Sequence, residues 1–246
     1  YNKERVDCEK IVMTSSNLVT TSSVFETMLI GDTYKIDENK IKKIIPGVDK
    51  KIFIPDSSIE KENIILSIGR IQKQKGQIQT LEFLNNFKKF EKDFKCYFIG
   101  GPSGKNGKEY LNELKQSVED LNLNSHVEFL DNLPQSEIID LFKKAKLMIH
   151  TSQFETFGLV AIEANAMGVP VLTTNNGSLM EIIENNKNGY LSDSLLDGNV
   201  NNFVNNLFND DAKYEEISSS CIEKSKKYDW VKTTNELESL YKQLVR

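Results

Sequence analysis

The sequence predicts an α/β protein with a doubly wound parallel sheet, on two observations. Short apolar runs rich in β-branched residues alternate with amphipathic helical segments along most of the 246 residues. The connections between them are rich in Gly, Pro, Asn and Ser, which the ends of strands and helices require. This alternation indicates βαβ units, and therefore a parallel sheet with helices on both faces.

In chain order, each expected strand is a short apolar run, and each expected helix carries its apolar residues at helical spacing. The expected strands are Asn63–Ile68, Phe94–Ile99, His126–Leu130, Leu147–Thr151, Val169–Thr173 and Gly189–Ser192. The expected helices between them are Gln77–Phe90, Gly107–Leu121, Ser136–Ala145, Phe157–Met167 and Leu179–Glu184. A strand-like run, Ile11–Thr14, precedes these elements, and a last helix is expected around Trp230–Val245. Ligands of such sheets bind beyond the carboxyl ends of the strands, so we look for a site in the loops after the first four strands.

Composition excludes several classes of function. The net charge of −5 argues against nucleic acid as the main partner, because contacts to phosphates dominate that kind of affinity. The three cysteines are scattered and lack the spacing of a metal site, which favours free thiols and a cytoplasmic location. We find no signal peptide and no apolar run of about 18 residues that could span a membrane. We interpret both histidines, His126 and His150, as structural and expect no metal.

The run from Phe154 to Gly168 is the most informative part of the chain. It places Glu155 in a loop and Glu163 eight residues later, in a helix that is otherwise almost wholly apolar. A helix that is apolar all round is buried, and a buried carboxylate without a partner is costly. Glu163 therefore needs hydrogen-bond donors, which we interpret as hydroxyls of a ligand. The alternative is a carboxylate at the rim of a helix, bonded to backbone or to a buried Arg.

Two further loops carry features of a phosphate site. After the first strand, Arg70 and Lys75 supply cations, and Gly76 opens a helix whose first amides favour an anion. After the second strand, residues 100–105 form a glycine-rich turn that lets a ligand approach the backbone. Each feature alone also fits a solvated surface loop or a tight turn.

The loop after the fourth strand joins these features into one site. Four consecutive amides are expected to point out of the sheet edge towards a phosphate or sugar oxygen, those of Thr156, Phe157, Gly158 and Leu159. Glu155 can accept from the hydroxyls of one sugar, and Glu163, about two turns deeper, from those of another. Two carboxylates that flank free amides and face two cations predict a site for a nucleotide diphosphate sugar.

At these residues the chain resembles the retaining glycosyltransferases of GT-B fold in the group 1 (GT4) family, which includes sucrose-phosphate synthases. The matching motifs are Gly69-Arg70 with Lys75-Gly76, Gly100–Gly104, Val127–Leu130, Glu155 to Glu163 with Phe157-Gly158-Leu159 between, and the linker Ile45–Asp49. The resemblance covers nearly the whole chain. It implies a Rossmann-like domain that binds a UDP-, GDP- or ADP-sugar, with UDP favoured. It also implies transfer of a hexose or N-acetylhexosamine to a hydroxyl acceptor.

The resemblance implies a catalytic role for three residues, Arg70, Lys75 and Glu155. The two cations would neutralise the diphosphate as the glycosidic bond breaks, and Gly69 would belong to the same donor-binding loop. Attack is expected on the front face of the sugar, with the leaving phosphate taking the proton of the acceptor. Such a scheme needs no metal or other cofactor, and no carboxylate pair of the glycosidase kind.

The resemblance also assigns the remaining donor contacts. Glu155 and the four amides that follow it would hold the transferred sugar and the distal phosphate, and Glu163 would hold the ribose hydroxyls. The base would meet the backbone of one expected strand end, at Glu128, Phe129 and Leu130.

The early position of the linker predicts an incomplete pair of domains. Family members have two Rossmann-like domains of about 180 to 200 residues each, with the site between them. Here residues 1–45 match the tail of the acceptor-side domain and the linker, residues 46–228 the donor-binding domain, and residues 229–246 a helix that crosses back. We therefore expect most of the acceptor-side domain on a longer gene or a partner chain. The acceptor site, and any peripheral contact with a membrane, would go with it, so transfer by this chain alone should be negligible.

Two other functions remain open from the sequence. The chain could be a binding module or subunit that keeps a nucleotide-sugar site and transfers nothing. A different chemistry on the same fold, such as a UDP-sugar 2-epimerase or a phosphorylase, would require catalytic groups in other loops or a much longer chain. A smaller departure is Asn176-Gly177, where the family often has paired glycines.

Overall fold

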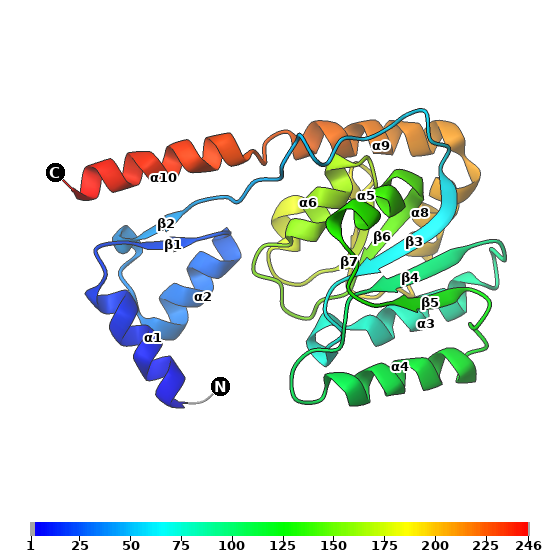
Figure 1. The fold of residues 1–246 in the computed structure, drawn as a ribbon, viewed down its shortest axis with the longest axis horizontal. Coiled ribbons are helices and arrows are strands. Elements are labelled where there is room, and N and C mark those ends of the chain that lie inside the picture. Colours follow the sequence, from blue (N-terminus) through cyan, green and yellow to red (C-terminus); the bar gives the residue numbers. More distant parts are fainter. Residues whose placement is uncertain (1–2, 246) are drawn as a thin grey trace.

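The structure is a computed structural model that describes residues 3–245. Residues 1 and 2 of the expected tail and residue 246 of the expected crossover helix lie outside the described residues. Figure 1 shows a larger unit, in which helices cover both faces of a sheet, and a smaller unit beside it. The predicted α/β fold with a parallel sheet is confirmed.

The sheet of the larger unit has six parallel strands in the order β5-β4-β3-β6-β7-β8. The strands are β3 (Glu62–Ile68), β4 (Lys95–Ile99), β5 (Val127–Leu130), β6 (Ala145–His150), β7 (Val171–Thr174) and β8 (Gly189–Ser192). The chain moves outwards from β3 to one edge and then from β6 to the other. The loops after the neighbouring strands β3 and β6 therefore leave in opposite directions, and ligand crevices form at such a switch point.

Helices cover the sheet in two layers. One layer consists of α3 (Gln77–Phe87), α4 (Gly107–Asp120) and α8 (Gly198–Asn209). The other consists of α5 (Gln135–Lys144), α6 (Leu159–Ala166) and α7 (Leu179–Ile182). Helix α9 (Asp211–Ser225) packs on both α6 and α8. Along β3, Ile65 packs into the first layer and Ile64 and Leu66 into the second, as expected of a strand buried on both faces.

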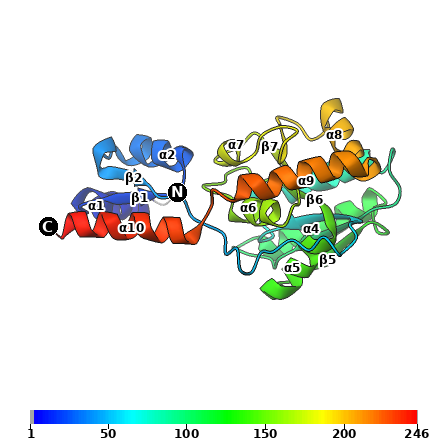
Figure 2. The same cartoon turned by 90° about the horizontal axis from the view of Figure 1, so that it is seen from above.

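The smaller unit contains two helices and two short strands. Its elements are α1 (Lys3–Ser15), β1 (Val19–Thr21), α2 (Val24–Tyr34), the 3-10 turn η1 (Glu38–Lys40) and β2 (Ile41–Lys43), with β1 and β2 parallel. The last helix, α10 (Trp230–Leu244), lies beside this unit (Figure 2). Thr233 on α10 fastens it there, because its hydroxyl donates to the carbonyl of Ile45 at 2.6 Å.

The chain crosses between the two units twice, and the two crossings touch. Val48 forms a parallel bridge with Asp229, and its amide donates to the carbonyl of Tyr228 at 3.4 Å. A Cβ at Gly47 would lie 2.2 Å from the amide nitrogen of Trp230, so only glycine lets the two segments approach this closely. The predicted division into residues 1–45, 46–228 and 229–246 stays a prediction.

The predicted strand Ile11–Thr14 is wrong, because this run lies inside α1. Short apolar runs do not distinguish strand from helix. Here a local ion pair between Arg5 and Glu9, four residues apart and 2.7 Å long, stabilises the helix. Helices α2, α8 and α9 were absent from the predicted set.

No helix within residues 3–245 is both long and apolar enough to cross a membrane.

Candidate functional site

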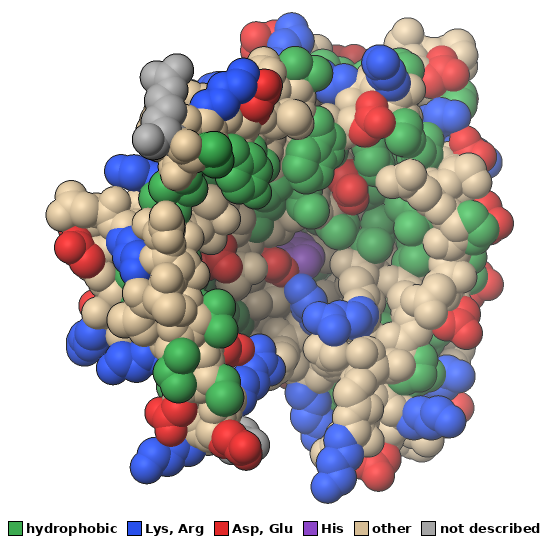
Figure 3. All heavy atoms as spheres, turned by 60° about the vertical axis from the view of Figure 1, so that its left-hand side comes forward, with side chains coloured by type: hydrophobic (Ala, Val, Ile, Leu, Met, Phe, Trp, Pro, Cys, Tyr) green, Lys and Arg blue, Asp and Glu red, His purple; other side chains and the backbone are tan. Residues whose placement is uncertain are grey.

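A hollow opens between the two units, with acidic, basic and histidine side chains at its floor (Figure 3). The loops after β3 and β6 meet there, because hydrogen bonds to backbone carbonyls join them. The amide of Gln153 donates to the carbonyl of Gln74 at 2.8 Å, and the hydroxyl of Thr151 donates to the carbonyl of Gly76 at 2.8 Å. Gly76 has a φ of +66°, and a Cβ at this position would lie 2.2 Å from the carbonyl oxygen of Thr151. Glycine is therefore required where the two loops touch.

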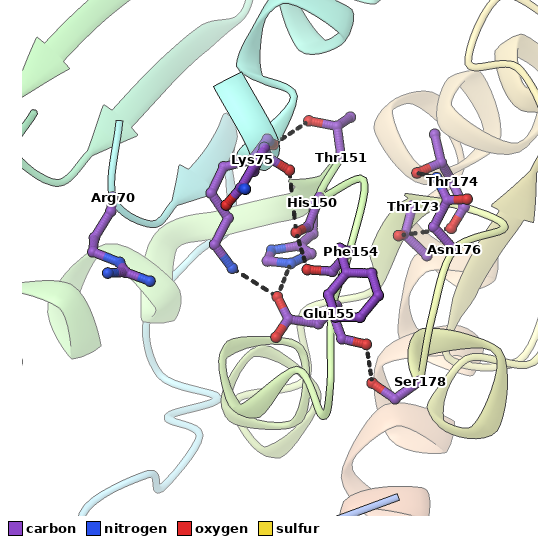
Figure 4. A network of polar contacts seen from close by, with 12 residues as sticks. Arg70, Lys75, His150, Thr151, Phe154, Glu155, Thr173, Thr174, Asn176 and Ser178 are labelled. Carbon is purple, nitrogen blue, oxygen red and sulfur yellow. Dashed lines mark hydrogen bonds and ion pairs between the residues drawn. The ribbon is translucent and has the colours of Figure 1, made fainter. Parts of the chain in front are cut away.

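This contact brings the predicted residues Lys75 and Glu155 together. Lys75 Nζ donates to Glu155 Oε2 at 2.8 Å, and His150 Nε2 lies 3.0 Å from the same oxygen. Figure 4 shows both side chains converging on Glu155, with Arg70 to one side of this cluster. Burial opposes the charge on Glu155, but the hydrogen bonds from His150 and Lys75 outweigh it and lower its pKa to about 2. Glu155 is therefore ionised at neutral pH.

His150 is a member of this cluster that the sequence did not predict. It is the last residue of β6 and is buried, and its ring points towards Glu155 (Figure 4). An ionised carboxylate only accepts hydrogen bonds, so the contact to Glu155 requires a proton on His150 Nε2. The signal available in the sequence was its position immediately before the loop of Glu155. His126, by contrast, stacks on Phe94 with ring centroids 4.3 Å apart, in agreement with a structural role.

Arg70 lies in the same loop as Lys75 but does not join the cluster. Its side chain is exposed, and its guanidinium makes no ion pair within residues 3–245. The backbone of this loop is fixed at Arg70, because Gln77 Nε2 donates to the carbonyl of Arg70 at 2.9 Å. Gly69, with a φ of +153°, borders open space where a Cβ would stand. Lys75 is thus paired with Glu155, whereas Arg70 carries no ion pair within residues 3–245.

The four predicted amides, those of residues 156–159, are free. None of them donates a hydrogen bond to any group among the described residues. Gly158 adopts a left-handed conformation, with a φ of +92°, and α6 therefore begins at Leu159 rather than at Phe157. The side chain of Phe157 is buried against Tyr228, with ring centroids 6.1 Å apart, so its ring belongs to the hydrophobic core.

Glu163 lies in α6, the helix that follows the loop of Glu155. Its carboxylate has no hydrogen bond or ion pair within the part of the chain that the structure describes. Burial raises its pKa above the usual value for a glutamate. The alternative partners considered from the sequence, a buried Arg or a backbone amide, are absent within residues 3–245. Its neighbour on the helix, Asn165, is satisfied by Asn188 and the carbonyl of Val169, and is structural.

The predicted base-binding residues lie further away along the sheet. Strand β4 separates β5 from β3, so Glu128, Phe129 and Leu130 are not brought into the cluster around Glu155. Glu128 is exposed, and Phe129 stacks on Phe98 with ring centroids 5.1 Å apart. The end of β5 adjoins the glycine-rich turn, because Gly100 donates its amide to the carbonyl of Leu130 at 3.2 Å. The roles predicted for these residues stay predictions.

A second group that the sequence did not predict holds the backbone of Glu155. Both the amide and the hydroxyl of Ser178 donate to the carbonyl of Glu155, at 3.0 and 3.1 Å. Gly177 has a φ of +67°, and a Cβ there would lie 2.3 Å from the same carbonyl oxygen. Of the Asn176-Gly177 pair, the second position is therefore the one that requires glycine.

Comparison with known proteins decides the family. Residues 49–228 match the family described as glycosyl transferases group 1, and this match covers more than half of the chain. The chain belongs to this family. D-inositol 3-phosphate glycosyltransferase of Corynebacterium urealyticum is 26% identical to it over 251 residues, which cover 96% of this chain and 59% of that protein. The chain thus spans less than two thirds of the length of this curated relative.

Solved structures share the fold of this group 1 chain. Sucrose-phosphate synthase from Thermosynechococcus elongatus matches it with a TM-score of 0.86 at 23% identity, covering 99% of this chain and 62% of that one. HepE of Anabaena, solved in complex with UDP-glucose, matches with a TM-score of 0.87 at 21% identity, covering 99% and 68%. These likenesses confirm the predicted GT-B fold.

Proposed function

We propose that this chain is the donor-binding half of a retaining glycosyltransferase that uses a nucleotide diphosphate sugar, with UDP as the favoured nucleotide. The observation that carries the proposal is the cluster of Lys75, His150 and Glu155 beside four amides that donate to no group within residues 3–245. Such a site presents acceptors for sugar hydroxyls and donors for phosphate oxygens within one crevice. The complex of HepE with UDP-glucose supports this choice of donor.

The charges of the site suit the departure of a diphosphate. As the bond from the sugar C1 to the phosphate oxygen breaks, its electron pair passes to the diphosphate, which gains negative charge. Arg70 and Lys75 would stabilise that charge, together with the amides of residues 156–159. The acceptor oxygen would bond to C1 on the same face, and its proton would pass to the leaving phosphate. Glu155 and Glu163 would orient the sugar and the ribose, so neither would need to accept a proton.

No metal enters this scheme, because the two cations of the β3 loop take its place. The transferred group would be a hexose or an N-acetylhexosamine and the acceptor a hydroxyl compound held outside this chain. A second candidate function is a module that binds the nucleotide sugar and transfers nothing, since the same cluster around Glu155 would serve such a module.

The deciding experiment is calorimetric titration of the chain with UDP, GDP and ADP, and with their glucose and N-acetylglucosamine conjugates. We expect one nucleotide to bind selectively and its sugar conjugate to bind more tightly. Glu155→Ala should remove the extra affinity of the conjugate, by roughly 1.5–3 kcal/mol for hydrogen bonds to a charged group. The binding of the sugar conjugate should be unchanged by a metal chelator.

Glu184→Ala provides a matched control. Glu184 also pairs with two cations, Lys187 and Lys224, and its pKa is likewise lowered to about 2, but it lies on the surface after α7. Its loss should leave nucleotide-sugar binding unchanged. Failure of every nucleotide to bind the unmodified chain would contradict the proposed site. To separate transferase from binding module, the chain is then tested together with an acceptor-side domain for transfer.

A further inference from the structure

The smaller unit contacts the two residues that flank Glu155, Phe154 and Thr156. The carbonyl of Thr156 accepts a hydrogen bond of 2.6 Å from the hydroxyl of Ser23, the residue that also caps helix α2. On the other side, the ring of Phe154 meets the ring of Phe25 edge to face, with centroids 5.4 Å apart. The residues immediately before and after Glu155 are therefore both held by the first turn of α2.

That first turn is held in its place by a carboxylate of the larger unit. Glu181 on α7 accepts from the amide of Phe25 at 2.9 Å with one oxygen and from the amide of Val24 at 3.1 Å with the other. The first amides of a helix have no partner inside it, and a carboxylate is favoured at that end. Ser23 already supplies the usual cap within the helix. The two bonds to Glu181 therefore have a further effect, which is to join α2 of the smaller unit to α7 of the larger unit.

Glu181 is also linked to Glu155 through Ser178, which lies three residues before it. Ser178, whose amide and hydroxyl both hold the carbonyl of Glu155, precedes α7 directly. The backbone of Glu155 is thus fixed from the larger unit by Ser178 and from the smaller unit by the first turn of α2. Glu181 joins these two supports into one closed ring of contacts.

We propose that Glu181 is a positioning residue for Glu155, acting by holding the first turn of α2 against the loop of residues 154–156. The ring of contacts sets where the Glu155 carboxylate stands relative to Lys75 and His150. Loss of Glu181 releases α2, and with it the support of Thr156 and Phe154. The part of this inference that concerns a bound sugar rests on the proposed function. The part that concerns the place of Glu155 does not.

The test is Glu181→Ala, measured in two ways on the full chain. Without ligand, the ring signals of the two histidines are recorded by NMR. His150 touches Glu155, so its signals should move, whereas those of His126, which stacks on Phe94, should not. With ligand, affinity for UDP-glucose should fall about tenfold while affinity for UDP changes little, since linked sites couple by roughly 5- to 150-fold.

Two further variants keep the test decisive. Ser23→Ala removes the hydrogen bond to the carbonyl of Thr156 directly. It should reproduce both the shift of the His150 signals and the loss of affinity for UDP-glucose. Asp210→Ala is the control, because it also removes a carboxylate that accepts from an amide in the first turn of a helix. Asp210 accepts from the amide of Lys213 at the start of α9. This control should lower stability alone, and leave the His150 signals and the preference for UDP-glucose as in the unmodified chain.

The outcomes separate this inference from the proposed function. Unchanged His150 signals in Glu181→Ala, or an undiminished preference for UDP-glucose over UDP, overturn the positioning role and leave a purely structural contact. If the unmodified chain shows no preference for UDP-glucose, the sugar-binding role of Glu155 fails instead. In that case the His150 signals alone decide whether Glu181 positions Glu155.

Discussion

The carboxylates of Glu155 and Glu163 have opposite surroundings and opposite pKa shifts. In the folded chain the pKa of Glu155 falls from 4.5 to about 2, because hydrogen bonds from His150 and Lys75 outweigh the effect of burial. The pKa of Glu163 rises, because it is partly buried and has no hydrogen bond or ion pair within residues 3–245. Each shift links the stability of the fold to pH, with opposite signs.

For Glu155, stability is gained above its unfolded pKa and lost as the pH falls through its folded pKa. We therefore expect Glu155→Gln to lower the free energy of unfolding at neutral pH by roughly 3 kcal/mol, at about 1.4 kcal/mol for each pKa unit. The difference between the two proteins should shrink as the pH falls from 4.5 towards 2. Thermal unfolding across this range measures it. A difference that stays constant down to the lowest pH would disprove the lowered pKa.

For Glu163, the raised pKa means that ionisation costs stability, so the cost is absent in acid and appears as the pH rises. Glu163→Gln should therefore raise the free energy of unfolding at neutral pH, by up to about 1 kcal/mol, as is common when a functional site is relieved of strain. Nucleotide affinity should fall in the same variant, while affinity for pyrophosphate should not. Equal losses for both ligands, or a loss of stability, would assign Glu163 a structural role.

At the scale of elements, the site depends on the contact between the β3 and β6 loops. Gly76→Ala should destabilise the fold by about 2 kcal/mol or more, because a left-handed residue with a side chain costs about 1 kcal/mol before any clash. The clash is with the carbonyl of Thr151. Gly31→Ala, inside α2 and with no atom within 4 Å of the new Cβ, is the control and should be neutral or stabilising. Urea unfolding compares the two, and equal midpoints would contradict the role of the contact.

The elements of the larger unit could be predicted because their signal is local. Strands β3 to β8 are short, largely apolar runs, and the position of Lys75 and Glu155 in loops after strand ends follows from strand–helix alternation. The strand order that makes β3 and β6 neighbours was not predicted. His150, Ser178 and Glu181 could not be found in this way, because their importance lies in which residue they touch across the fold. The error at Ile11–Thr14 has the same origin, since a short apolar run carries no information about its neighbours.

At the scale of the whole molecule, the two units are joined where α10 meets the linker. Thr233→Val removes the hydrogen bond from α10 to the carbonyl of Ile45 and should cost about 1 kcal/mol of stability. Thr234→Val is the matched control, because the hydroxyl of Thr234 bonds only to Trp230 within its own helix and is exposed. Chemical unfolding measures both. Similar losses in the two variants would mean that the bond to Ile45 contributes nothing across the units.

The touching crossings at Gly47 and Trp230 limit how the two units can move. A single tether leaves its ends free to twist and swing in every direction, whereas two tethers bridged at Val48 and Asp229 form a strap that bends but resists torsion. We therefore expect the two units to bend about this double connection more easily than they twist about it. Such bending would lengthen or restore the hydrogen bond between Ser23 and the carbonyl of Thr156. We therefore expect opening of the hollow and release of the Glu155 loop from the smaller unit to occur together.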